Sequence, residues 1–174
     1  MAITVRQVPT ALTWRNFREV DTLPDGGGEE VAQINPVTEN RQDIAIQRTP
    51  SGRLRLGDYT ISIIVGRERT AVLRTAAKTA ELLKHEQGHH DLFFLAMRAM
   101  ARELEAIEAT DPDDLGHQMQ ETSNLHATRA ETIDSTYDRE TEHGKNQEQQ
   151  ARWDAAIGEA KRDAAAAHIL THPL

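Results

Sequence analysis

The sequence predicts an α+β fold in which a small N-terminal sheet, antiparallel or mixed, packs on a long helix followed by two further helices. Apolar and polar residues alternate in short runs up to about residue 65, which is typical of strands. From about residue 75 the apolar period becomes helical. Strands that precede all the helices are typical of α+β domains. We expect a single domain over residues 1–174, strand-rich at 1–70 and helical at 71–174.

The predicted strands are short and lie in two regions. Residues 3–8, ITVRQV, alternate apolar and polar side chains, and the run ends at Pro9. Residues 44–65 hold three alternating runs separated by turn sequences, which predicts an antiparallel meander. Between these regions, Trp14 and Phe17 are expected to anchor the core, because the chain has only two Trp and three Phe residues.

Three helices are predicted in the second part of the chain. The first spans about residues 75–110 and ends at the sequence DPDD. The second spans about residues 114–135 and is polar over much of its surface. A break at YDRETEHG precedes the third, which spans about residues 145–168 and contains Trp153.

Composition excludes several classes of function. The net charge is −8 and the basic residues are scattered among acids, so nucleic acid is not expected as a partner. No apolar run approaches the roughly 20 residues of a membrane span, and cysteine is absent, so any metal must be held by His, Asp or Glu. Without a secretory signal at its N-terminus, the chain as encoded is expected to be cytoplasmic, with a trimmed or exported form left open.

The sequence HEQGH at residues 85–89 is the principal candidate for chemistry. Its two histidines, His85 and His89, lie about 40° apart around a helix and one turn along it, so both imidazoles can reach one metal ion. Glu86 can then act as a general base toward a metal-activated water. The alternative is an amphipathic helix with these residues on its solvent face. Gly88 argues against it, because glycine inside a helix indicates a close neighbour, here expected to be a strand.

A catalytic zinc normally takes three protein ligands, so a third is needed. The residues that follow the motif lack the glycine and histidine of the metzincin pattern. Glu108 is too far along the same helix, and the polar stretch that holds His117 and His126 predicts surface histidines. His143 is favoured because it lies in the predicted helix break, just before Gly144. The full candidate set is Glu108, His117, Glu121, His126, Glu142 and His143.

Three segments resemble a bacterial family described as predicted zinc-dependent proteases of the zincin type, once catalogued only as a domain of unknown function. LLKHEQGHHD resembles the family's HEQGHFD segment, and LTWRNF resembles its LTW-x-x-F element upstream. YDRETEHGKNQEQQARWD resembles the downstream YD-x-x-T-x-HG element with its following Gln and Trp. The three matches occur in the family's order and span about residues 12–157.

The resemblance implies a zincin-like fold, with zinc ligands at His85, His89 and His143 and with Glu86 as general base. Tyr137 is a candidate donor to the oxyanion of a tetrahedral intermediate. Asp91 matches the family's aspartate but faces away from the metal, so we interpret it as a structural anchor. His90 replaces the family's aromatic residue, which indicates either a more solvated outer face or a weak second metal contact.

The predicted function is that of a zinc-dependent metallopeptidase that hydrolyses a peptide or protein substrate through a zinc-activated water. The substrate is expected to lie along an edge strand, for which YTISIIV at residues 59–65 is the candidate. An inhibitor or regulatory partner is left open. The alternative is a non-catalytic metal-binding or scaffold module in which the HExxH site is structural, with four protein ligands and no open position.

Overall fold

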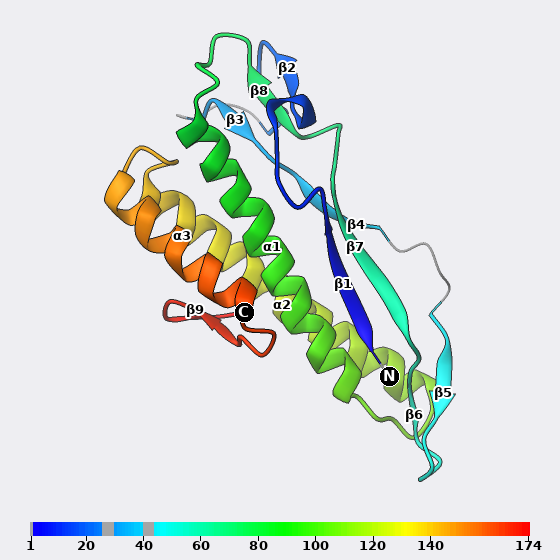
Figure 1. The fold of residues 1–174 in the computed structure, drawn as a ribbon. Helices are drawn as coiled ribbons and strands as arrows, with labels where there is room; N and C mark the ends of the chain where they lie inside the picture. The colour runs from blue at the N-terminus through cyan, green and yellow to red at the C-terminus, as the bar shows by residue number, and fades with distance from the viewer. Residues whose placement is uncertain (1, 26–29, 40–43) are drawn as a thin grey trace.

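The computed structural model describes residues 2–25, 30–39 and 44–174 (Figure 1). In these ranges the chain forms an α+β fold of small sheets and three helices. Helix α1 (Ala80–Ala106) lies between strand β1 on one side and helices α2 (Pro112–Thr141) and α3 (Gln147–Arg162) on the other (Figure 1). The α+β prediction is confirmed at this level.

The sheet that packs on α1 has the strand order β1-β7-β4. Strand β1 (Ile3–Val8) runs parallel to β7 (Tyr59–Val65), and β4 (Pro36–Glu39) runs antiparallel to it on the other side. A second mixed sheet has the order β2-β8-β3 and lies beside the start of α1 (Figure 1). Its strands are β2 (Arg18–Val20), β8 (Ala71–Leu73) and β3 (Ala32–Gln33).

Two hairpins complete the described strands. β5 (Ile46–Arg48) pairs antiparallel with β6 (Leu54–Leu56), and β9 (His168–Ile169) pairs with β10 (His172–Pro173). The predicted meander is therefore correct for β5 and β6 only. β7 follows β6 in the chain but does not pair with it; it lies between β1 and β4 in the β1-β7-β4 sheet. The prediction that residues 59–65 form a sheet edge is therefore wrong. Ile61 and Ile63, on one face of β7, are buried in the core beneath α1.

The helices differ from the prediction mainly at their ends. α1 begins at the capping residue Thr79, whose hydroxyl accepts a hydrogen bond from the Leu82 amide, and it is shorter than expected. It ends early because the backbone of Ala109 pairs with Leu54, the first residue of β6. α2 continues six residues beyond the expected end at Ser135, to Thr141, and so carries Tyr137 and Asp138 on its last turns.

Three clusters of buried apolar side chains hold the elements together, and α1 contributes to each of them. The first lies between α1 and the β1-β7-β4 sheet. The second lies between α1, α2, α3 and the β9-β10 hairpin, with Trp153 fully buried at its centre. The third contains Phe17, with Trp14 packed against it, and reaches Leu82 at the start of α1. No helix in the described ranges has the length and apolar character needed to cross a bilayer.

Candidate metal centre

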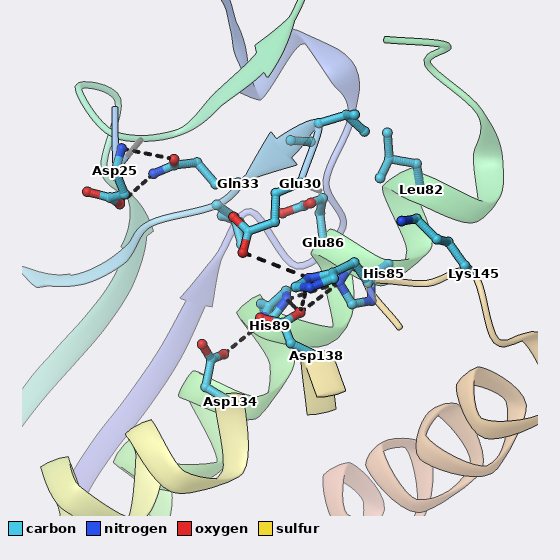
Figure 2. A pocket seen from close by; sticks show the side chains of 14 residues that line it. Asp25, Glu30, Gln33, Leu82, His85, Glu86, His89, Asp134, Asp138 and Lys145 are labelled. Atoms are coloured by element: carbon cyan, nitrogen blue, oxygen red, sulfur yellow. Dashed lines mark hydrogen bonds and ion pairs between the residues drawn. The ribbon is translucent and has the colours of Figure 1, made fainter. Parts of the chain in front are cut away.

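Two imidazoles from α1 and one carboxylate from α2 converge on a common point (Figure 2). The Nε2 atoms of His85 and His89 lie 3.2 Å apart. Oδ1 of Asp138 lies 3.1 Å from His85 Nε2 and 3.0 Å from His89 Nε2. The i, i+4 spacing of the histidines places them one turn apart on one face of α1, and α2 packs across that face.

The outer nitrogen of His85 is held by a chain of buried hydrogen bonds. Gln150 of α3 uses its amide nitrogen to donate to Tyr137 Oη at 2.7 Å and to Asp154 Oδ1 at 2.9 Å. Its amide oxygen therefore faces His85 Nδ1, 3.2 Å away, and accepts a hydrogen bond from it. This contact fixes the ring so that Nε2 of His85 faces the point of convergence, where it can offer a lone pair to a metal ion when Nδ1 alone carries a proton.

His89 is oriented in the same way by a carboxylate. Its Nδ1 donates to Asp134 Oδ1 at 2.6 Å, which turns Nε2 toward Asp138. Burial alone would lower the pKa of His89, but Asp134 and Asp138 outweigh burial and hold that pKa well above its ordinary value. Burial alone would likewise raise the pKa of Asp138, but hydrogen bonds from His85 and His89 hold it below its ordinary value. The point of convergence therefore favours positive charge.

The distances fit a zinc ion. Ligand atoms at tetrahedral positions, each about 2.0–2.1 Å from zinc, are separated by about 3.3 Å. The three separations among His85 Nε2, His89 Nε2 and Asp138 Oδ1 are 3.0–3.2 Å. Three electron-rich atoms held this close repel one another unless a cation or a proton lies between them. Histidine and aspartate are common zinc ligands in proteins. A carboxylate commonly accepts a hydrogen bond from the second ring nitrogen of a zinc-bound histidine, as Asp134 does from His89.

His143 lies beside this point, in the turn after α2. Glu142, His143 and Gly144 all have positive φ, and this left-handed turn reverses the chain toward α3. Gly144 approaches His85 so closely that a Cβ there would lie 2.9 Å from His85 Cβ. Nδ1 of His143 is 3.4 Å from Asp138 Oδ1 and 3.8 Å from Glu30 Oε1. Its ring centroid is 6.5 Å from that of His85, and its side chain remains one-third exposed.

Glu86 is buried next to the same point, and only 2% of its surface is exposed. Its Oε2 has no hydrogen-bond partner among the described residues. Burial raises the pKa of Glu86 to about 7, and Asp138 and Glu30 add to this rise. A carboxyl group with such a pKa can both accept and return a proton near neutral pH.

Tyr137 is packed behind the histidines instead of facing the cavity. The side chain is fully buried, and its ring stacks on His85 with centroids 4.8 Å apart. The hydroxyl donates to the backbone carbonyl of His85 at 3.1 Å. Gly88 makes this contact possible, since a Cβ at residue 88 would lie 2.1 Å from Tyr137 Oη. The close neighbour that Gly88 indicated is thus a tyrosine of α2, and the prediction of a strand there is wrong.

A cavity of about 320 Å³ opens in front of these residues (Figure 2). His85, Glu86, His89 and Asp138 form its floor from α1 and α2. The opposite wall comes from residues 30–34, which include strand β3. Among the described strands β3 pairs with β8 alone, so it is an edge of its sheet. Glu86 and the point of convergence therefore face this edge across the cavity.

Sequence reasoning missed Asp134 and Asp138. The two carboxylates are spaced i, i+4 on α2, as the two histidines are on α1, and this repeated spacing was the available signal. Besides the convergence with His85 and His89, Asp138 belongs to two further groups of described residues that could hold a metal ion: His85, Asp138 and His143, and His89, Asp134 and Asp138.

The remaining candidate ligands lie in other surroundings. Glu108 pairs with Arg53, while exposed His117 pairs with Glu121. His126 is fully buried, with Nε2 3.2 Å from Glu103, so the expectation of a surface histidine there is wrong. Glu142 is exposed and forms the left-handed C-cap of α2.

Two neighbours of the motif point away from the cavity. His90 is fully buried and its Nε2 lies 3.1 Å from the carbonyl of Pro9, so the expectation of a solvated face is wrong. Asp91 accepts hydrogen bonds from Gln7, Gln87 and Lys161 through Oδ1, and thus joins α1 to β1 and α3, as expected of an anchor.

Comparison with known families gives one finding. Residues 66–144 match the model of a family described as a bacterial protein of unknown function, DUF922. The matched segment covers less than half of the chain and includes both the HEQGH sequence and the turn at His143. Comparisons with curated proteins and with solved structures give no match.

Proposed function

We propose that this protein is a zinc-dependent peptidase with a zincin-like arrangement of its active site. The convergence of His85 Nε2, His89 Nε2 and Asp138 Oδ1 beside a buried glutamate is the observation that carries the proposal. An open cavity next to these atoms supports a catalytic role, because a catalytic zinc site keeps one position free for water or substrate.

In this proposal His85, His89 and Asp138 hold the zinc ion. His143 was the third ligand expected from the sequence, but Asp138 Oδ1 lies within 3.1 Å of both helix Nε2 atoms, whereas the ring centroid of His143 is 6.5 Å from that of His85. Gln150 and Asp134 fix the orientation of the two imidazoles from outside, as partners of metal-bound histidines commonly do. Tyr137 acts as a positioning residue through its stacking on His85, in place of the oxyanion role expected from the sequence.

A zinc ion held by these residues would make a bound water more acidic and would polarise a substrate carbonyl. Glu86 accepts the proton of the attacking water, and the same carboxyl later delivers a proton to the leaving amine. His143, at the side of the cavity, is placed to donate a hydrogen bond to the carbonyl oxygen under attack.

An extended substrate segment fits along residues 32–39. β3 and β4 lie in this segment, and in the described part of the chain each is an edge strand of its own sheet. We assign the substrate to this edge and not to β7, because β7 is paired with β1 on one side and with β4 on the other. Backbone hydrogen bonds to such an edge bind a substrate largely independently of its sequence.

Glu86→Gln tests the proposed turnover. The variant should bind zinc as the wild type does, because Glu86 is not a ligand, and it should lose cleavage of a denatured protein by about 10²–10⁴-fold. Zinc content is measured by elemental analysis, and cleavage by mass spectrometry of the products. Wild-type protein that holds zinc but leaves a set of denatured proteins intact would reject the peptidase assignment.

One observation favours a second candidate, a structural metal site. Asp138 and His143 together with the two helix histidines could supply four protein ligands, which would leave no open position. Zinc titrations of Asp138→Ala and His143→Ala separate the two candidates. The peptidase proposal expects a large loss of zinc affinity in Asp138→Ala and little loss in His143→Ala. A large loss in both variants would favour the structural site.

A further inference from the structure

A second cavity lies directly beside the candidate metal centre. Its volume is about 480 Å³, and it shares His89, Asp134 and Ile34 with the first cavity. Leu92, Phe93 and Met97 of α1 form its floor. Pro36 and Thr38 of β4 also line the second cavity, so both cavities lie along the chain segment of residues 32–39.

The second cavity combines an apolar floor with an acidic rim. Leu92 and Met97 are largely buried, and Phe93 is half-buried, so an apolar side chain entering here would be removed from water on contact with them. Glu131 and Asp134 are exposed on α2 at the rim. The first cavity adds Asp25 and Glu30, against one lysine, Lys145, among the described residues of its lining. Both cavities therefore disfavour acidic ligands.

We infer that the second cavity binds a large apolar side chain of the substrate, next to the bond that is cut, and that basic residues are preferred around that side chain. This inference rests on the proposed function, because it names the substrate class of the same site. The shared lining of the two cavities is the argument for adjacency: one extended segment along residues 32–39 passes both. Selectivity for the substrate side chain then comes from the second cavity and not from the strand edge.

The variant Ala127→Trp tests this inference. Ala127 is an exposed residue of α2 that lines the second cavity but not the first, so an indole there occupies the second cavity from the side of α2. Ala155→Trp is the matched control. Ala155 is an exposed alanine of α3 outside the described cavities, so the same substitution there should leave both cleavage and binding unchanged.

The probes are short synthetic peptides that carry Leu, Ala or Asp at one position between lysines, and the Leu peptide again with glutamates in place of the lysines. Binding of each fluorescently labelled peptide to zinc-free protein is measured by fluorescence anisotropy, and cleavage by zinc-loaded protein is measured by mass spectrometry. The Leu peptide flanked by lysines should bind about 10-fold or more tightly than its Ala counterpart. Ala127→Trp should abolish this difference, whereas Ala155→Trp should retain it.

The two readouts separate this inference from the proposed function. If the Leu peptide binds selectively and Ala127→Trp removes the selectivity, but no peptide is cleaved, the apolar site stands and the peptidase assignment falls. If cleavage occurs and Glu86→Gln abolishes it, but Leu, Ala and Asp peptides behave alike, the peptidase assignment stands and the apolar site is overturned. Equal binding of the lysine- and glutamate-flanked Leu peptides would overturn the charge preference.

Discussion

Gly88→Ala should destabilise the protein, although alanine is normally the better helix former. In an exposed helix the substitution would stabilise by up to about 1 kcal/mol. Here the new Cβ would lie 2.1 Å from Tyr137 Oη and 2.5 Å from Tyr137 Cζ, so the ring must move. Overpacking of this kind costs about 1–3 kcal/mol, and the displaced hydroxyl also loses its hydrogen bond to the His85 carbonyl, worth about 1 kcal/mol.

The net expectation is a loss of about 1–3 kcal/mol in the free energy of unfolding. At this chain length each kcal/mol lowers Tm by roughly 2–4 °C. Urea denaturation of metal-free protein, followed by circular dichroism, measures the effect without a contribution from zinc. Gly116→Ala is the control, because a Cβ at Gly116 of α2 would have no neighbour within 4 Å, and this variant should be stabilised. If Gly88→Ala is as stable as Gly116→Ala, the packing of Tyr137 against α1 is wrong.

Three further changes test the surroundings of the site. Asp134→Asn weakens the partner of His89 Nδ1 and should lower zinc affinity by about 10–100-fold in a chelator competition assay, with unchanged affinity counting against the orienting role. Asp91→Ala removes the acceptor shared by Gln7, Gln87 and Lys161 and should lower the free energy of unfolding, measured by urea denaturation, by about 1–3 kcal/mol. Asp91→Asn keeps an acceptor and should lower it less. Equal losses in the two variants would argue against Asp91 as an anchor. Chelation of the metal should lower the Tm of zinc-loaded wild type, because a ligand bound only by the native state stabilises it by about 2.7 kcal/mol at a free concentration 100 times its Kd. The double variant His85→Ala/His89→Ala should show no such dependence.

The features that could be predicted from the sequence are those set by local spacing. The helical period of residues 80–106 and the i, i+4 positions of His85 and His89 depend only on nearby residues, so α1 and the orientation of its motif followed directly. The apolar content around the motif also predicted correctly that His85 and Glu86 would not lie on a solvent face.

The features that the sequence did not reveal depend on contacts between distant residues. β7 pairs with β1 at a separation of 56 residues, and no local pattern distinguishes this arrangement from a meander. Asp138 reaches His85 across 53 residues, and only the packing of α2 on α1 brings the two together. The neighbour of Gly88 was likewise expected to be a strand because close approach can be inferred from a glycine, whereas the identity of the approaching side chain cannot.

The zinc content of the purified protein tests the central claim most directly. After incubation with excess zinc and removal of unbound metal, elemental analysis of the wild type should give stoichiometric zinc, and His85→Ala/His89→Ala should give none. His117→Ala, which changes an exposed histidine far along α2 from Asp138, should load as the wild type does. If the wild type retains no zinc, or if the double variant retains as much as the wild type, then His85, His89 and Asp138 do not form a metal centre.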